Sequence, residues 1–275
     1  MSFTELNGVI ERAGVTNADG KYEDVIAEFD RRISLLAGAY PFRKTGSQLL
    51  LSLDSYDSYQ AYLFQLLVSA QTRYPGIRVD ERTWIDISKL FEALVKSALK
   101  VHLNGDAEVI GSPRRGAAPS GFDDMLTYLS GRLHEERRPD AELGGNEKDN
   151  SADVVAWVPF KDHRRGKPVL LVQCATGSDY TSKDTELNGV IEDWNDYFRW
   201  GLSKPLLGFA FPFVCASHKQ WNEFSRHGGI VLDRLRLASC SGVLSNTDNL
   251  ASEVDVHNRL LLALLSRLDS TLAAV

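Results

Sequence analysis

The sequence predicts an α/β protein, in which helices flank a mixed β-sheet and a mostly helical extension precedes it. Three observations indicate this class. Apolar residues at helical spacing alternate along the chain with strand-length apolar runs. Two of these runs, residues 152–160 and 168–175, are joined by the charged connection KDHRRGK, which predicts a β-hairpin. With 275 residues, of which 43% are apolar, the chain can bury a core without disulfides or a structural metal.

We divide the chain into three parts. Residues 1–80 form the N-terminal, mostly helical extension, residues 81–240 form the α/β core, and residues 241–275 form a C-terminal helix that packs on the core. The boundaries follow the change from isolated helical patterns to alternating helices and strands. The extension shows packing patterns only, and its sequence indicates no function.

The elements follow in chain order from apolar spacing and from turn residues. In the extension, helices are predicted over residues 22–36 and 59–74, with a short strand at 47–53. The core begins with a helix over residues 84–103, whose apolar residues recur every three or four positions until Asn104-Gly105 ends it. The remaining predictions are a strand at 108–110, a helix at 122–137, the hairpin, a helix at 184–199, a strand at 206–213, a helix at 219–226, a strand at 229–232 and a helix at 254–272.

Composition and charge narrow the function classes. The net charge of −6, from 31 basic and 37 acidic residues, argues against a histone-like or repressor-like DNA binder, but a nuclease with a local basic groove remains open. Three cysteines without a CxxC pair argue against a disulfide framework and a zinc ribbon. The N-terminus lacks signal-peptide features, and no apolar run approaches the roughly 20 residues that span a bilayer. We therefore expect a soluble cytoplasmic protein without a membrane partner.

Common catalytic motifs are absent from the sequence. It contains no GxxxxGK[ST], GxGxxG, HExxH or GxSxG pattern, which lowers the odds of nucleotide-binding folds, zincins and serine hydrolases. The segment from Gln173 to Gly177 is superficially similar to a caspase cysteine motif, but one residue is missing between glutamine and cysteine. Cys174 is better interpreted as a small apolar residue on a buried strand.

The most informative polar residues lie at the ends of the predicted hairpin. Asp153 opens the first strand and Gln173 stands near the end of the second, while Glu92 lies on the preceding helix. Adjacent antiparallel strands place the start of one about 5 Å from the end of the other, so Asp153 should neighbour Gln173 or Cys174. The carboxylate, the amide oxygen and the Cys174 carbonyl would form a hard-oxygen site suited to Mg²⁺ or Mn²⁺. The alternative is that Asp153 caps a strand, Gln173 satisfies a buried backbone group and Glu92 is solvated.

The strings DVVAWVPF and LLVQCATG, on the two strands of the hairpin, resemble the PD-(D/E)xK nuclease superfamily, in the branch with glutamine in place of glutamate. The resemblance extends over about residues 84–237. It implies a restriction-endonuclease-like fold in which Asp153 binds the metal ion, Gln173 occupies the Glu/Gln position and Glu92, in FEALVKSAL, is the acid of the helix. Ala175 stands where the family has its lysine. The nearest replacement is Lys183, which would polarise the attacking water or stabilise the phosphorane.

The resemblance implies a Mg²⁺-dependent nuclease that hydrolyses DNA phosphodiester bonds. The wider string QCATGSDYTSK is also similar to nuclease-like proteins of bacterial antiphage defence, which implies a role in host defence, with a partner protein or a homo-oligomer left open. The alternative is a catalytically inactive nuclease-like module that binds DNA or a partner protein, and Ala175 favours it. The candidate phosphate contacts are Arg114, Arg115, Arg164 and Arg165, although a surface role is the simpler interpretation. The candidate base-stacking groups are Tyr180, Trp194, Tyr197, Phe198 and Trp200, although packing is the simpler interpretation.

Overall fold

The protein is described here by a computed structural model, which covers residues 18–45, 48–51, 56–74, 78–114, 118–138, 151–201, 204–215, 217–241 and 250–272. The predicted strand at 47–53 and the candidate Arg115 lie partly or wholly outside these residues. No helix in this part of the chain is both long enough and apolar enough to cross a membrane.

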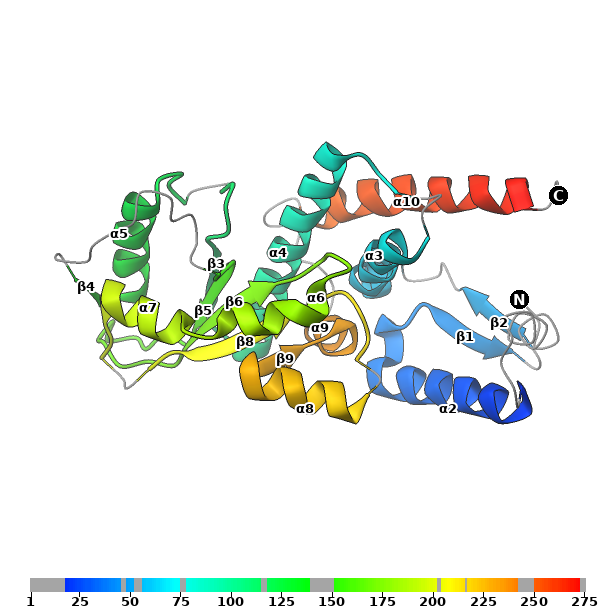
Figure 1. Ribbon diagram of the computed structural model, residues 1–275, viewed down its shortest axis with the longest axis horizontal. Helices are drawn as coiled ribbons and strands as arrows, with labels where there is room; N and C mark the ends of the chain where they lie inside the picture. The colour runs from blue at the N-terminus through cyan, green and yellow to red at the C-terminus, as the bar shows by residue number, and fades with distance from the viewer. Residues whose placement is uncertain are drawn as a thin grey trace.

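The centre of the molecule is a five-stranded mixed sheet (Figure 1). Its strands, in spatial order, are β3 (Asp106–Val109), β5 (Val154–Trp157), β6 (Val169–Cys174), β8 (Leu206–Ala210) and β9 (Ile230–Leu232). The first three pair antiparallel, and β6, β8 and β9 pair parallel. The predicted α/β class, with a mixed sheet flanked by helices, is confirmed, and β5 and β6 form the predicted hairpin.

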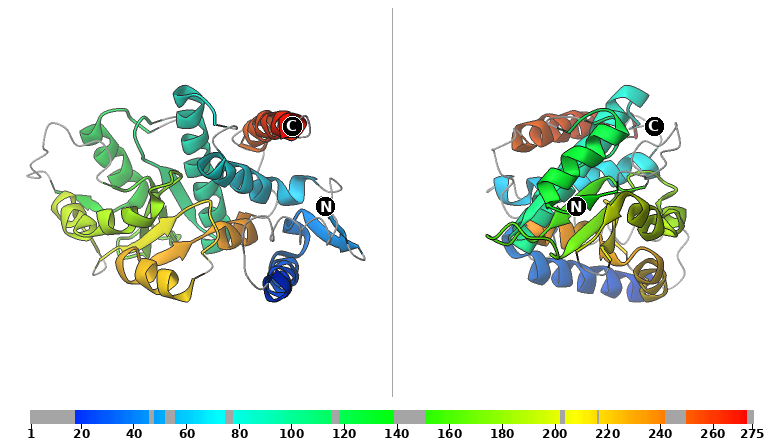
Figure 2. Two further views of the ribbon diagram at one scale, coloured as in Figure 1. Left: turned by 45° about the vertical axis from the view of Figure 1, so that its right-hand side comes forward. Right: turned by 90° about the vertical axis from the view of Figure 1, so that its left-hand side faces the viewer.

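Helices cover both faces of the sheet. Their bounds are α2 (Ala18–Leu36), α3 (Tyr56–Arg73), α4 (Glu81–Leu103), α5 (Phe122–Leu133), α6 (Tyr180–Lys183), α7 (Val190–Tyr197), α8 (His218–His227), α9 (Arg234–Ser241) and α10 (Leu250–Leu272). One core cluster joins α3, α4 and α10 to Val154, Ala156, Leu170 and Val172 of the sheet. The second joins α5, α7 and α8 to the alternate residues Val155, Trp157, Val169 and Leu171. Figure 2, on the right, shows α10 and α8 on opposite sides of the sheet.

The helix α4 has clear sequence causes at both ends. The Asp80 side chain accepts a hydrogen bond from the Thr83 backbone N–H and caps the first turn. Asn104 adopts the left-handed conformation, with φ of 46°, that ends helices. Between them one stripe, which includes Ile87, Phe91 and Leu94, is fully buried. This stripe fixes the rotation of α4 and therefore the direction in which its polar residues point.

Several element predictions were wrong. The helix predicted at 122–137 ends at Leu133, because Glu136–Arg137 forms the short strand β4, paired with β7 (Phe198–Arg199). The helix predicted at 184–199 is divided into a 3-10 helix (Asp184–Leu187) and α7, since Gly189, with φ of 89°, breaks the helical path. The strand β1 (Phe42–Thr45), which pairs with β2 (Gln48–Leu51), and the helix α9 were not predicted.

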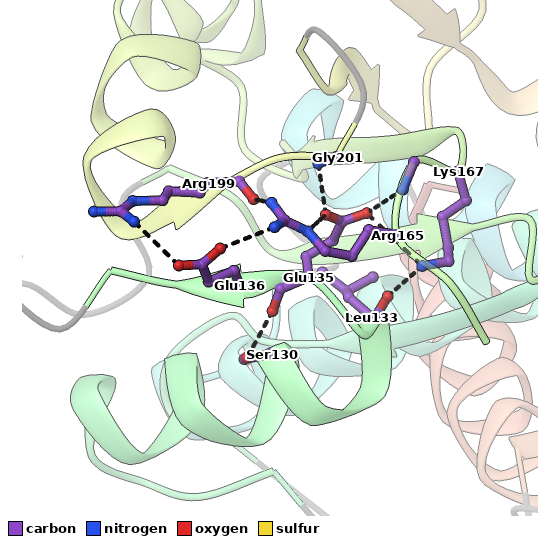
Figure 3. A network of polar contacts seen from close by, with 9 residues as sticks. Ser130, Leu133, Glu135, Glu136, Arg165, Lys167, Arg199 and Gly201 are labelled. Carbon is purple, nitrogen blue, oxygen red and sulfur yellow. Dashed lines mark hydrogen bonds and ion pairs between the residues drawn. The ribbon is translucent and has the colours of Figure 1, made fainter.

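A buried glutamate ties α5 and β4 to the hairpin connection (Figure 3). The carboxylate of Glu135 accepts hydrogen bonds from the backbone N–H of Gly166 at 2.9 Å and of Gly201 at 2.7 Å. It also forms ion pairs with Arg165 at 3.3 Å and with the buried Lys167 at 3.7 Å. Arg165, a candidate phosphate contact, therefore has a structural role in this network.

Replacing Glu135 by glutamine should lower the free energy of unfolding by about 3–5 kcal/mol, because the buried Lys167 ammonium loses its counter-charge. The matched control is Glu136→Gln. The Glu136 side chain is 45% exposed, so removing its ion pair with Arg165 should change stability by about 1 kcal/mol or less. Urea denaturation of both variants measures the difference, and equal losses would show that burial of the Glu135 network is not what stabilises it.

Candidate metal-binding site

Asp153 is held by backbone hydrogen bonds at the end of the hairpin, one residue before β5 begins. Its N–H donates to the Val172 carbonyl at 2.8 Å, and its carboxylate Oδ2 accepts from the Cys174 N–H at 2.8 Å. Its carbonyl accepts from Ile110 and Gly111, at 2.7 and 3.0 Å. Asp153 thus contacts the β6 backbone immediately before and immediately after Gln173. The N–H groups of a strand lie in the plane of the sheet and point to the side of the strand. Because the Asp153 carboxylate accepts one of them, it lies at the edge of β6, between the two faces of the sheet.

Glu92 and Asp153 meet at Gly111. Glu92 lies on α4 and is only 6% exposed, so the alternative of a solvated Glu92 is wrong. A methyl group on the Cα of Gly111 would lie 2.6 Å from Asp153 Oδ1 and 2.8 Å from Glu92 Oε2. The two carboxylates therefore surround one glycine Cα, and the absence of a side chain there leaves room for both.

Lys89 supplies a buried positive charge to this carboxylate pair. Its Nζ donates to both carboxylate oxygens of Glu92, at 2.8 and 3.0 Å, and the residue is 8% exposed. The two residues are three apart on α4, which places them on the same face of the helix. Lys89 was not among the predicted site residues, although its spacing of three residues to Glu92 was a usable signal.

The two carboxylates, Asp153 and Glu92, affect the pKa of the neighbouring Cys174 thiol. Burial raises the pKa of the Cys174 thiol well above its usual range, and the Asp153 and Glu92 carboxylates raise it further, while Lys89 opposes them. Cys174 is thus a poor thiolate nucleophile, and it enters the site through its backbone N–H. This arrangement agrees with interpreting Cys174 as a packing residue.

Gln173 lies on the other face of β6 and contacts a residue that the sequence analysis did not identify. Its Nε2 donates to Glu186 Oε2 at 2.7 Å. Glu186, in the 3-10 helix after α6, also accepts from Lys183 Nζ at 3.2 Å. The amide oxygen of Gln173 is buried and has no hydrogen-bond partner among the described residues. Lys183 is the last residue of α6, and its ammonium is held by Glu186.

Most of the other candidate contacts have structural roles. Arg114 donates to the Ser120 carbonyl at 2.6 Å, and Arg164 is an exposed residue beside Asp162. Three of the five candidate stacking groups are buried in the second core cluster, which supports the packing interpretation for Trp194, Tyr197 and Phe198.

The oxygen donors of the site fit a divalent cation such as Mg²⁺. No group of three or more His, Cys, Asp or Glu side chains in the described ranges is arranged to hold a metal. The donors that meet there are the two carboxylates at Gly111, which are hard ligands of the kind that Mg²⁺ prefers, whereas the Gln173 side chain lies on the opposite face of β6, bonded to Glu186. Mg²⁺ commonly keeps several waters, so few protein ligands are sufficient.

Comparison of the chain with protein-family models, with curated proteins and with solved structures gave no significant match.

Substituting Gly111 by alanine tests this geometry without any ligand. The new methyl group must displace the buried Glu92 carboxylate and the half-buried Asp153 carboxylate, which should lower the free energy of unfolding by about 1–3 kcal/mol. The matched control is Gly131→Ala on α5, where no atom lies within 4 Å of the added methyl group. Because alanine favours helix more than glycine does, that variant should gain about 0.5–1 kcal/mol. A neutral Gly111→Ala variant in chemical denaturation would show that the carboxylates are not packed around this glycine.

Proposed function

We propose that the protein is a metal-dependent nuclease with a restriction-endonuclease-like core that hydrolyses DNA phosphodiester bonds. The observation that carries this proposal is the contact of Asp153, at the head of a hairpin strand, with Glu92 from the preceding helix around Gly111. The order of helix, Asp-headed strand, hairpin and Gln-bearing strand is the order of the nuclease family that the sequence resembles. A role in host defence is part of the proposal through that resemblance.

Asp153 and Glu92 would hold the cation, and Gln173, which the resemblance also gives as a ligand, would have to reach it from the opposite face of β6. When bound there, a divalent cation activates water and neutralises charge on a phosphodiester. The backbone N–H of Cys174 orients the Asp153 carboxylate, and the buried stripe of α4 fixes Glu92. These contacts preorganise the oxygen donors, so little rearrangement is needed when the ion arrives.

Two lysines can replace the ammonium that Ala175 does not supply. Lys89 is bonded to Glu92, one of the two carboxylates at Gly111, whereas the Lys183 ammonium is bonded to Glu186. A nearby ammonium stabilises the negative charge that develops on the phosphorus oxygens. The contacts favour Lys89 for this role and leave Lys183 as the second candidate.

The alternative function is a catalytically inactive nuclease-like module that binds DNA or a partner protein. Two observations favour it: Ala175 occupies the lysine position, and Lys89 already neutralises Glu92. An inactive module of this kind would bind DNA or its partner protein without cleaving DNA.

The first functional prediction concerns Asp153. The purified protein should nick supercoiled plasmid DNA with Mg²⁺ or Mn²⁺ and should not do so in EDTA. Asp153→Asn should lower the nicking rate at least about a hundredfold, because the strongest oxygen donor is lost. The matched control is Asp162→Asn in the hairpin connection, whose side chain is 57% exposed and should leave the rate unchanged.

Gel electrophoresis separates nicked from supercoiled plasmid, and fluorescence anisotropy with a labelled duplex measures binding. Binding without nicking, with the same affinity in EDTA, would favour the inactive module. Nicking that survives Asp153→Asn would place the active site elsewhere.

The second functional prediction identifies the ammonium. Lys89→Met should reduce nicking about a hundredfold or more, whereas Lys183→Met should stay within a fewfold of the wild type. Lys89→Arg keeps a positive charge beside Glu92 and shows whether a loss in Lys89→Met arises from misfolding. The reverse ranking of the two methionine variants would assign the role to Lys183.

A further inference from the structure

Two histidine rings meet at the end of the hairpin where its two strands are connected. His134 is the C-cap of α5, and His163 lies in the connection between β5 and β6. Their ring centroids are 5.0 Å apart, with an angle of 62° between the ring planes. Both residues are exposed, so an ion from the solvent can reach the pair. Neither residue takes part in the proposed hydrolysis.

The backbone at both positions is one that side chains seldom adopt. The φ angle is 51° at His134 and 55° at His163, in the left-handed region that favours glycine and asparagine. Among the described residues, five other than glycine have a positive φ, and two of the five are these histidines, in a chain with six histidines. Glycine or asparagine would hold either turn at lower cost. The fold alone therefore does not explain why an imidazole stands at both positions.

The Glu135 network fixes the positions of both histidines. His134 directly precedes the buried Glu135. The N–H of His163 donates to the Phe160 carbonyl at 3.1 Å and closes a turn in the hairpin connection. Glu135 accepts a hydrogen bond from the N–H of Gly166 in the same connection. Because Glu135 thus joins the end of α5 to the connection, the two imidazoles are brought together before any ligand binds.

The separation of the rings matches that of two imidazoles on one metal ion. With a Zn–N distance of about 2.0–2.1 Å and tetrahedral angles, the centroids of two imidazoles bound to one ion lie roughly 5 Å apart. The preference of histidine for particular χ2 angles is weak, so each ring can turn a nitrogen toward a shared point without a change in the backbone. Imidazole is a ligand that zinc, copper and nickel accept readily, whereas Mg²⁺ prefers oxygen.

We propose that His134 and His163 together bind a divalent transition-metal ion such as Zn²⁺. No group of three or more His, Cys, Asp or Glu side chains in the part of the chain that the structure describes is arranged to hold a metal, so water would fill the remaining coordination positions. The ion links the end of α5 to the hairpin connection, the two segments that Glu135 already joins. This site is independent of the proposed nuclease centre, whose carboxylates lie at the other end of the hairpin.

The test measures binding of Zn²⁺ to the full chain by isothermal titration calorimetry, in a buffer with excess Mg²⁺ to occupy oxygen sites. His134→Asn and His163→Asn each remove one imidazole, and both variants should fold because asparagine tolerates the left-handed backbone. Each should raise the Kd for Zn²⁺ at least about tenfold, since even residues that only orient metal ligands commonly have effects of that size. The matched control is His218→Asn, at an exposed histidine of α8, whose Kd should equal that of the wild type.

Thermal unfolding gives a second measurement. An ion that binds only the folded chain stabilises it, so Zn²⁺ should raise the melting temperature of the wild type and of His218→Asn much more than that of either pair variant. An unchanged Kd in His134→Asn or in His163→Asn would overturn the inference, because the two rings would then not share an ion, as would a wild type that binds no Zn²⁺. Asp153→Asn should leave the Kd unchanged, and a loss there with both pair variants intact would move the ion to the carboxylates at Gly111.

Discussion

The pairing of β5 with β6 is the constraint on which the rest of the molecule depends. Both strands are buried on both faces, and alternate residues of the same hairpin enter the two core clusters. The helical layers on the two faces of the sheet therefore both pack against this one pair of strands. A shift of one residue in their register would exchange the residues that face the two clusters, so the register is strongly determined.

Buried charges lie at both ends of this hairpin, but they are balanced differently. At the closed end, Glu135 accepts two backbone N–H groups and pairs with two cations, so its charge is fully compensated. At the open end, two carboxylates surround Gly111, and Lys89 is the cation bonded to Glu92. The closed end has the character of a structural network, whereas at the open end Lys89 is bonded to one of the two carboxylates that meet at Gly111.

Sequence reasoning predicted the parts of the structure that repeat a pattern. The hairpin strands and α4 follow from runs of apolar residues, and the predicted α4 is short by only three residues, at its N-terminal end. The strands β4 and β7 have two residues each and give no periodic signal. The helix α9 was missed because arginines at 234 and 236 interrupt its apolar pattern, although Arg234 is buried over the Tyr62 ring.

The residues of the candidate site also fall into two groups, those that a sequence pattern predicts and those that only tertiary contacts reveal. Asp153, Gln173 and Glu92 could be named because strand pairing and the family resemblance both point to the end of the hairpin. Lys89 and Glu186 were not predicted, since a lysine or a glutamate on a helix usually faces solvent, and only the spacing of Lys89 to Glu92 offered a signal. Their roles arise from tertiary contacts: the burial of α4 brings Lys89 to Glu92, and the break at Gly189 separates Glu186 from α7.

The placement of Lys89 and Glu92 on α4 has a consequence for how this protein can change. The helix that carries these charges is also the one whose apolar stripe joins α3, α10 and the sheet. One inserted or deleted residue in α4 would rotate the following residues by roughly 100° and move them by roughly 1.5 Å. Such a change before Lys89 would misalign the charged pair or the apolar stripe, so the chemistry at this site cannot drift in position while the core stays intact. Changes in chain length should therefore be tolerated only in segments outside α4.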